Sequence, residues 1–254
     1  MRALPPLAFL AAFVLTVVVA LHTSLGLHDD VALFRHVSGT DLAHVRGAGY
    51  RSLQVIDVGS VVVGLAGISA LALLRRRVAQ AGAAAAVVLL SVASAEALKH
   101  WLPTGADRPP TFPSGHVAVA ASLGLALVLA VPPVLRPVAA LVGAAYAAGI
   151  GLAVVVLAWH YPSDVVGAFS IAGFWASVAA VLLRTRVSLS SRGLLIAAGA
   201  GAVALVLAAV VAGHHPEAAA ALRTSRALVA ASVAFGLISL ATFGVVAPLA
   251  QERE

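Results

Sequence analysis

The stretch VAALVGAAYAAGIGLAVVVLA occupies residues 138–158 and carries no charged side chain. A run of roughly 18 or more apolar residues is long enough to cross a bilayer as a helix. Gly143, Ala147 and Gly151 recur here at intervals of four residues, and small side chains at this interval let helix backbones approach closely in lipid. We therefore predict a membrane-spanning helix that packs tightly against its neighbours.

Comparable apolar runs recur along the chain and predict eight spans. Apolar residues make up 61% of the 254 residues and charged residues 10%, whereas soluble domains carry about 45–50% and about 25%. The expected spans are Leu7–Leu27, Ser52–Leu74, Gly82–Leu98, Gly115–Ala130, Val138–Ala158, Asp164–Leu183, Gly193–Gly213 and Ala227–Leu249. The predicted fold class is all-α, a polytopic membrane helical bundle.

The basic residues lie in short segments between these runs, a distribution typical of membrane topology signals rather than of nucleic-acid binding. One side of the predicted bundle holds Arg2, Arg75, Arg76, Arg77, Arg136, Arg184, Arg186, Arg192 and Arg253. Because cytoplasmic loops are enriched in Lys and Arg, we place that side in the cytoplasm. The expected location is the cell membrane, of a bacterial plasma membrane kind. The segments after the third and fifth spans then face outward. The chain has no cysteine and therefore no thiolate metal site.

The segment after the third span carries two cations. Lys99 is the only lysine of a chain that otherwise uses arginine, and Arg108 follows it, just before Pro109. A compact point charge beside a second cation is typical of phosphate binding. The alternative is a lysine that extends to the membrane interface from a helix end. Glu96, one turn before Lys99, is expected to pair with it.

Pro113-Ser114-Gly115-His116 opens the fourth span. Ser114 is a good N-cap, and Gly115 lets a ligand approach the backbone. Free N–H groups and the positive end of the helix dipole make a helix N-terminus a site for anions. His116 is then expected in the first turn, beside this site.

His160-Tyr161-Pro162-Ser163-Asp164 joins the fifth and sixth spans. Pro162 favours the first turn of a helix, so the sixth span is expected to begin here. Asp164, four residues after His160, can accept a hydrogen bond from one imidazole nitrogen and leave the other free as a nucleophile. A structural pair at the interface is the alternative. Because odd-numbered spans end on the outer side, this segment and the one after the third span are predicted to meet.

The order of these motifs resembles the type 2 phosphatidic acid phosphatase superfamily. Its pattern is Lys, six residues, Arg-Pro; then Pro-Ser-Gly-His; then Ser-Arg, five residues, His, three residues, Asp. The resemblance covers about residues 52–183. It implies a six-helix phosphatase core within residues 1–190 and leaves residues 191–254 as two additional transmembrane helices.

The resemblance also implies a role for each motif residue. His160 would be the nucleophile that forms a phosphohistidine, Asp164 its orienter, and His116 the acid that protonates the leaving oxygen. The residues implied in phosphate binding are Lys99, Arg108, Ser114 and Gly115.

The chain departs from this pattern at two points. Eight residues rather than six separate Lys99 from Arg108, a difference that an insertion at Thr104-Gly105 absorbs. Ala153-Val154 stands in place of Ser-Arg, so one phosphate-binding cation is absent, a loss of roughly 1.5–3 kcal/mol. The candidates to replace it are His100, Arg46 and Arg51.

These motifs predict a metal-independent membrane lipid phosphatase without a cofactor, acting at the outer face on polyprenyl pyrophosphate, phosphatidic acid or a similar lipid. Two alternatives are a phosphotransferase that uses the same site and a non-catalytic relative that binds or moves a phospholipid. Asp57, expected inside the second span, is a weaker functional candidate because it can instead pair with Arg51. His214-His215, expected on an outer loop, is more simply explained by solvent exposure than by metal binding.

Overall fold

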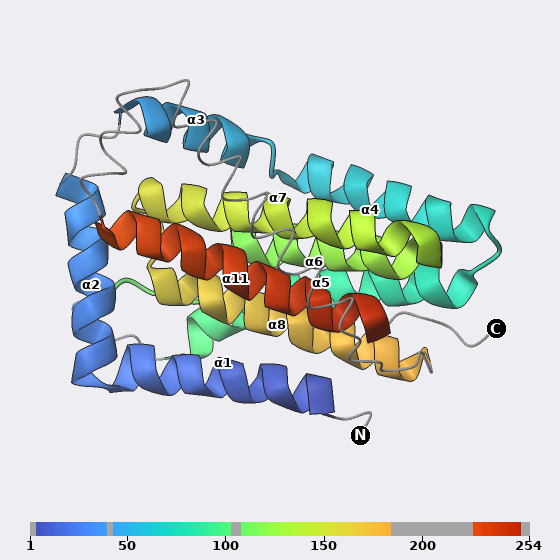
Figure 1. Ribbon diagram of the computed structural model, residues 1–254, viewed down its shortest axis with the longest axis horizontal. Helices are drawn as coiled ribbons and strands as arrows, with labels where there is room; N and C mark the ends of the chain where they lie inside the picture. Colours follow the sequence, from blue (N-terminus) through green and yellow to red (C-terminus); the bar gives the residue numbers. More distant parts are fainter. Residues whose placement is uncertain (1–3, 40–42, 103–107, 184–225, 250–254) are drawn as a thin grey trace.

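A computed structural model describes residues 4–39, 43–102, 108–183 and 226–249, and these ranges contain helices and no strand. Most of the helices lie roughly along one direction, as Figure 1 shows; they are α1 (Leu4–His22), α4 (Val58–Leu74), α5 (Val78–Trp101), α6 (Gly115–Ala130), α7 (Arg136–Val156), α8 (Pro162–Leu182) and α11 (Arg226–Leu249). The short helix η1 (Pro133–Leu135) precedes α7. The predicted all-α bundle is confirmed.

Two polar helices lie at one end of this bundle. Helix α2 (Ser24–Gly39) crosses the ends of the long helices and contacts α7 and α8 (Figure 1). Helix α3 (Ala43–Gln54) packs against α7. The polar segment between the first two predicted spans is therefore helical and covers the end of the bundle at which α5 and α7 finish and α6 and α8 begin.

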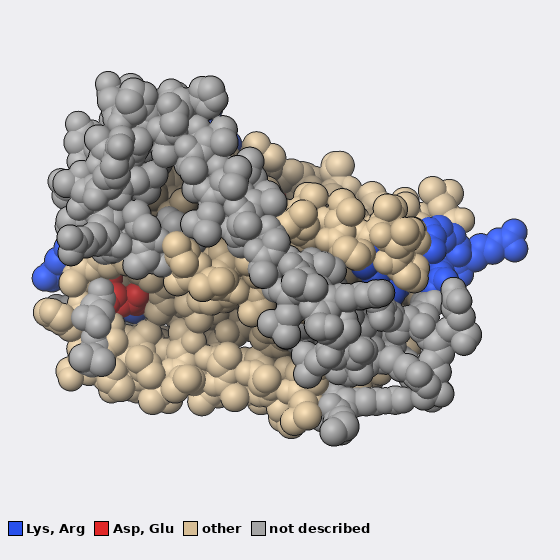
Figure 2. Space-filling model, in the orientation of Figure 1, with Lys and Arg blue, Asp and Glu red and all other residues tan. Residues whose placement is uncertain are grey.

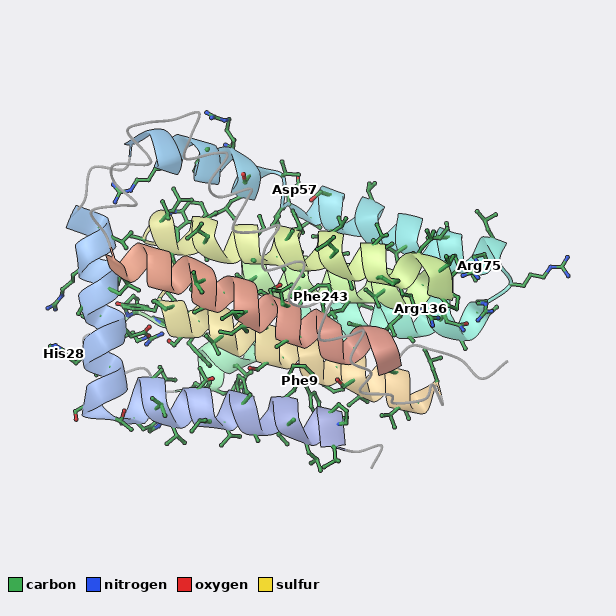
Figure 3. All side chains as sticks on the ribbon, viewed as in Figure 1. Phe9, His28, Asp57, Arg75, Arg136 and Phe243 are labelled. Carbon is green, nitrogen blue, oxygen red and sulfur yellow. The ribbon has the colours of Figure 1, made fainter. Side chains whose placement is uncertain are left out.

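Helix α6 forms the centre of the core and contacts α4, α5, α7, α8 and α11. Most of its side chains are buried, as expected for a helix that is apolar on all sides. At its crossing with α7, a Cβ added to Gly143 would lie 3.1 Å from the Cα of Gly124 and 2.5 Å from Cε1 of Phe243 on α11. The small-residue spacing in α7 therefore serves close packing, as predicted, and the Phe243 ring fills the crossing (Figure 3).

The number of spans differs from the prediction. Within the described ranges, four helical segments are long and apolar enough to cross a membrane: Leu4–His22, Val78–Trp101, Pro133–Val156 and Pro162–Leu182. A fifth is counted if Arg46–Gln54 and Val58–Leu74, which meet at 61°, form one broken span. Gly115–Ala130 and Val233–Gly244 are shorter apolar helices, and the span predicted at 193–213 lies outside the described residues. Several spans support a multi-pass membrane protein, but eight are not confirmed.

Asp57 lies at a break between two helices, so the prediction of a continuous helix through this residue is wrong. The chain turns at residues 55–57, and Asp57 is the N-cap of α4, with its Oδ1 accepting a hydrogen bond from Ser60 N at 2.6 Å. The Ser60 hydroxyl accepts from the Asp57 N–H in return, which completes a capping box. The carboxylate thus starts a helix, and the straight part of the predicted second span begins only at Val58.

Four arginines lie at the end of the bundle opposite α2: Arg75, Arg76, Arg77 and Arg136. Figure 3 places Arg75 and Arg136 at that end and His28 of α2 at the other. Figure 2 shows the described part of one face of the molecule with most of its Lys and Arg atoms at the same end. The end covered by α2 also carries cations, of which Lys99 and Arg108 pair with carboxylates.

Candidate active site

The candidate site lies where two helix N-termini meet. Ser114 N donates a hydrogen bond to the backbone carbonyl of Asp164 at 3.1 Å, which ties the start of α6 to the start of α8. Ser114 is also the N-cap of α6, with its hydroxyl oxygen facing Val117 N at 3.5 Å. The preceding Phe112 is fully buried, and a Cβ on Gly167 of α8 would lie 2.5 Å from its ring. The loop before α6 is thus fastened to α8 by its backbone and by a buried ring.

His160 and Asp164 form the hydrogen-bonded pair that the sequence predicts. His160 Nδ1 lies 3.0 Å from Asp164 Oδ2, and Tyr161 N donates to the same oxygen at 3.1 Å. Because a carboxylate accepts, Nδ1 is the donor in this pair, and Nε2 is the ring nitrogen that this bond leaves unused. Pro162 begins α8, as expected, and puts Asp164 in the first turn. Both side chains are buried, Asp164 completely.

The backbone that ends α7 sets the position of His160. Ala158 has φ 53°, in the left-handed region, and its N–H donates to Val155 O at 2.9 Å. Trp159 N donates to Val154 O at 3.0 Å, and His160 N approaches the same carbonyl at 3.3 Å. This is a Schellman ending, which reverses the chain within a few residues of the last helical turn. The reversal brings His160 to the start of α8.

Arg108 is buried and lies against the carboxylates of the site. Its terminal nitrogens donate to Asp30 Oδ2 at 2.6 Å, to Ser163 Oγ at 2.8 Å and to Asp164 Oδ1. The guanidinium carbon lies 4.1 Å from the centre of the Tyr161 ring. Arg108 Nε has no hydrogen-bond partner among the described residues. The implied phosphate clamp is therefore held within the protein by two carboxylates, and its role toward phosphate stays a prediction.

Lys99 lies at the other side of the α6 N-terminus. Its Nζ bonds Glu96 Oε1 at 2.7 Å, so the expected pair is confirmed. A Cβ added to Gly115 would lie 2.9 Å from Glu96 Oε1 and 3.2 Å from Lys99 Nζ. A side chain at this position would therefore require the ends of the Lys99 and Glu96 side chains to shift. The Glu96 carboxylate thus lies close to the position at which an anion is expected.

A cavity of about 560 Å³ opens beside Lys99. Its polar lining comes from Asp57, Glu96, Lys99, Gly115 and His116, and its apolar lining consists of Ile56, Val58, Val61, Val62, Val92 and Val119. The site residues His160, Asp164 and Arg108 do not line it. The His116 ring lies 5.8 Å from that of Trp159, the residue before His160, and so connects the cavity to the nucleophile side of the site.

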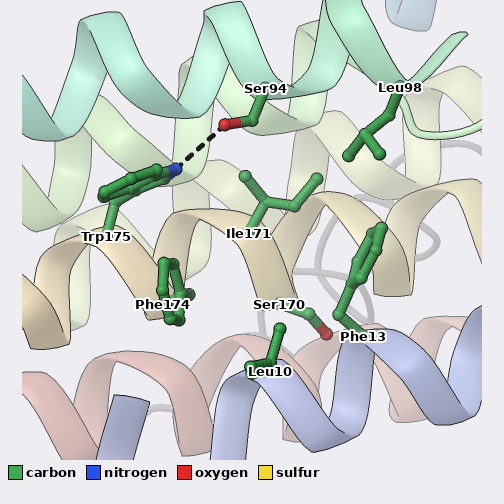
Figure 4. A pocket seen from close by; sticks show the side chains of 8 residues that line it. All are labelled: Leu10, Phe13, Ser94, Leu98, Ser170, Ile171, Phe174 and Trp175. Carbon is green, nitrogen blue, oxygen red and sulfur yellow. Dashed lines mark hydrogen bonds between the residues drawn. The ribbon is translucent and has the colours of Figure 1, made fainter. Parts of the chain in front are cut away.

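A second, smaller cavity of about 150 Å³ lies between α1, α5 and α8 (Figure 4). Its polar feature is a hydrogen bond of 3.0 Å from Trp175 Nε1 to Ser94 Oγ. The remaining lining is mostly apolar and includes Phe13 and Ile171. None of the motif residues lines this cavity, whereas Lys99, Gly115 and His116 line the larger one.

With this geometry in view, the comparisons with known proteins identify the motif-bearing segment. Residues 80–188 match the PAP2 superfamily. The match confirms the predicted family over α5 to α8, which contain or border all seven motif residues. The PAP2 superfamily supports a phosphatase that acts on phosphate esters. No curated protein and no solved structure matches the chain.

A packed valine, Val154, stands at the position at which the PAP2 pattern has its second arginine. Val154 is fully buried, and its carbonyl accepts the hydrogen bonds that end α7. Arg46, expected as a replacement cation, donates instead to the backbone carbonyls of Val37 at 2.8 Å and Val156 at 3.3 Å. It thus joins the end of α2 to the end of α7. The side chain of Arg51 is exposed.

Three residues of the candidate site were not found from the sequence. Asp30 and Ser163 bind Arg108, and Tyr161 stacks on it. Ser163 and Tyr161 lie inside the His160–Asp164 motif. The sequence places them at the start of a helix but does not indicate that they contact Arg108. Asp30 lies 78 residues before Arg108, and no periodicity or spacing connects the two. Thr104-Gly105 and His214-His215 lie outside the described residues.

Proposed function

We propose that the protein is a membrane lipid phosphatase that hydrolyses a phosphate ester or anhydride through a phosphohistidine on His160. The observation that carries the proposal is the hydrogen bond from Ser114 N to Asp164 O, because it joins the start of α6, where we propose that the phosphate binds, to the residue that pairs with His160. In-line phosphoryl transfer needs a positioned nucleophile and stabilisation of charge, and these two elements supply both.

The proposed reaction has two displacements at phosphorus. His160 Nε2 forms a bond to phosphorus while the bond to the leaving oxygen breaks, and His116 donates a proton to that oxygen. Water then attacks the phosphohistidine, His116 takes a proton from it, and inorganic phosphate leaves with His160 restored. Asp164 holds Nδ1–H throughout, while Lys99 and the N–H groups at the start of α6 offset the negative charge of the phosphoryl oxygens.

A lipid is the substrate class that the cavity favours. A phosphate bound at Lys99 and Gly115 would leave the rest of the substrate against the valines of α4, α5 and α6. Val58 and Val62 of α4 are 82% and 59% exposed, so this wall continues onto a surface that suits lipid chains. The arginines at the opposite end support a site that faces outward from the cytoplasm.

Phosphate release by the purified protein tests the proposal. With a panel of lipid phosphates and pyrophosphates, we expect hydrolysis that survives EDTA, because Lys99 and Arg108 supply the cations of the site. Vanadate should inhibit, since its trigonal bipyramidal adduct on His160 resembles the transition state. Activity lost in EDTA and restored by a divalent metal would overturn this mechanism. Transfer of label to an acceptor alcohol would indicate a phosphotransferase, and binding without turnover a non-catalytic relative.

The two histidines should differ in their response to the leaving group. We expect His160→Ala to abolish turnover and the acid-labile phosphoenzyme with every substrate. His116→Ala should slow hydrolysis of alkyl phosphates, but recover in part with aryl phosphates, which leave without a proton. The measurement is kcat for both variants on a matched alkyl and aryl phosphate. Equal residual activity of both variants on the aryl phosphate would contradict these roles.

A further inference from the structure

Helix α2 carries a buried carboxylate at the end of the bundle. Asp30 is 7% exposed, although α2 is polar and covers the bundle from outside. Its Oδ1 accepts from Ser163 N at 3.1 Å, and its Oδ2 accepts from the Ser163 hydroxyl and from Arg108 at 2.6 Å. Both carboxylate oxygens are therefore used, and both bind residues next to the His160–Asp164 pair.

Arg108 connects Asp30 to the nucleophile. One terminal nitrogen binds Asp30 and the other binds Asp164 Oδ1, while Asp164 Oδ2 faces His160 Nδ1 at 3.0 Å. The order of contacts is thus Asp30, Arg108, Asp164 and His160. A carboxylate that binds a cation with one oxygen and an imidazole with the other has a fixed orientation, and so has the imidazole.

A second contact from α2 fixes the same group. Phe34, one turn after Asp30, stacks on Tyr161 with ring centres 4.5 Å apart, and Tyr161 in turn supports the Arg108 guanidinium. One face of α2 therefore holds Arg108 by charge and, through Tyr161, by stacking. Burial raises the pKa of Asp30, and the bonds from Ser163 and the charge of Arg108 oppose this effect only in part. A carboxylate in this setting is expensive to bury unless its partners are in place.

We infer that Asp30 is a positioning residue of the active site, which holds Arg108 against Asp164 and so sets the orientation of His160. The inference rests on the proposed function, because the nucleophilic role of His160 belongs to it. According to this inference, α2 helps to position the catalytic residues. Arg108 then has a structural role and is not only a phosphate-binding residue. Asp30 itself touches neither substrate nor reacting atoms.

The test compares Asp30→Asn and Asp30→Glu with Ser38→Ala, a change at an exposed position of the same helix. Two readouts are taken on the full-length protein, each per folded molecule: kcat and KM for a lipid phosphate, and the rate at which diethyl pyrocarbonate modifies His160, followed by mass spectrometry. We expect Asp30→Asn to lower kcat by roughly 10- to 150-fold with KM nearly unchanged. His160 modification should slow as well. Asp30→Glu should recover part of both, and Ser38→Ala should match the wild type.

Three results would overturn the inference. If Asp30→Asn lowers KM and leaves kcat unchanged, Asp30 only competes with the substrate phosphate for Arg108. If only the folded fraction falls while kcat and the modification rate per folded molecule are unchanged, Asp30 is purely structural. Faster modification of His160 would show that Asp30 shields the ring and does not orient it. If the wild type releases no phosphate from any lipid, the proposed function fails, while the modification rates still decide the role of Asp30.

Discussion

The two cations of the site are each held by carboxylates, but in different environments. Arg108 is buried between Asp30 and Asp164, and a buried ion pair is costly to break. The side chains of Lys99 and Glu96 are 22% and 55% exposed, and an ion pair of this kind contributes little. We therefore expect Lys99, rather than Arg108, to exchange its partner for a phosphate, which would displace Glu96.

Removal of the Glu96 charge should tighten phosphate binding. We expect Glu96→Gln to lower the inhibition constant of inorganic phosphate by up to roughly 5-fold, because the substrate no longer competes with an internal carboxylate for Lys99. Glu96→Asp keeps the charge and serves as the matched control, with a smaller change. The measurement is competitive inhibition of hydrolysis at fixed pH and ionic strength. A weaker affinity in Glu96→Gln would instead mean that Glu96 orients Lys99 for the phosphate.

At the scale of the elements, the end of α7 reverses the chain and leads into α8 without a long loop. Ala158 adopts a left-handed conformation, which costs roughly 1–2 kcal/mol for a residue with a Cβ. The carbonyls of Val154 and Val155 are satisfied by this turn, and α8 begins at Pro162. His160, the proposed nucleophile, is thus positioned by backbone hydrogen bonds, without a long connection.

Ala158→Gly should stabilise the protein. Glycine removes the left-handed strain but adds freedom to the unfolded chain, so we expect the free energy of unfolding to rise by about 0.5–1 kcal/mol. Ala148→Gly, a change of the same size within α7, should lower it by about 1 kcal/mol. Thermal unfolding in detergent, followed by circular dichroism, measures both. A loss of stability in Ala158→Gly equal to that of the control would contradict the strain at this turn.

The sequence could predict those parts of the site that depend on short-range patterns. The N-cap at Ser114, the helix start at Pro162 and the His160–Asp164 bond follow from local rules and are confirmed. The environment of Arg108 could not be predicted, because the position of α2 is decided by packing between segments far apart in the chain. Asp57 was misplaced for a related reason: hydropathy continues across the turn at residues 55–57, whereas the capping box breaks the helix there.

At the scale of the whole molecule, the two ends of the bundle differ in chemistry. The site lies at the end covered by α2, and Arg75 and Arg136 lie at the other (Figure 3). Helices of suitable length join the two ends. If the end with Arg75 and Arg136 lies in the cytoplasm, the proposed reaction would take place at the outer leaflet and release phosphate outside.

Cysteine labelling tests this orientation directly, because the natural chain has no cysteine. We introduce one in α2 by His28→Cys and one between α6 and α7 by Val134→Cys, both at exposed positions. In intact cells, a membrane-impermeant maleimide should label the first variant and not the second. Lysed cells, in which both should react, are the control. The reverse pattern would place the site in the cytoplasm.

The Schellman ending of α7 also leaves an indole ring at the surface of the site. Trp159 is 41% exposed, and its ring lies 5.8 Å from the ring of His116. A protonated imidazole quenches indole fluorescence much more strongly than a neutral one, so the emission of Trp159 depends on whether His116 holds its proton. With Trp101 and Trp175 replaced by phenylalanine, the remaining emission would follow binding of vanadate or phosphate in real time. Trp159 is thereby an optical probe of His116, the proposed general acid, and would report occupancy of the site without any turnover.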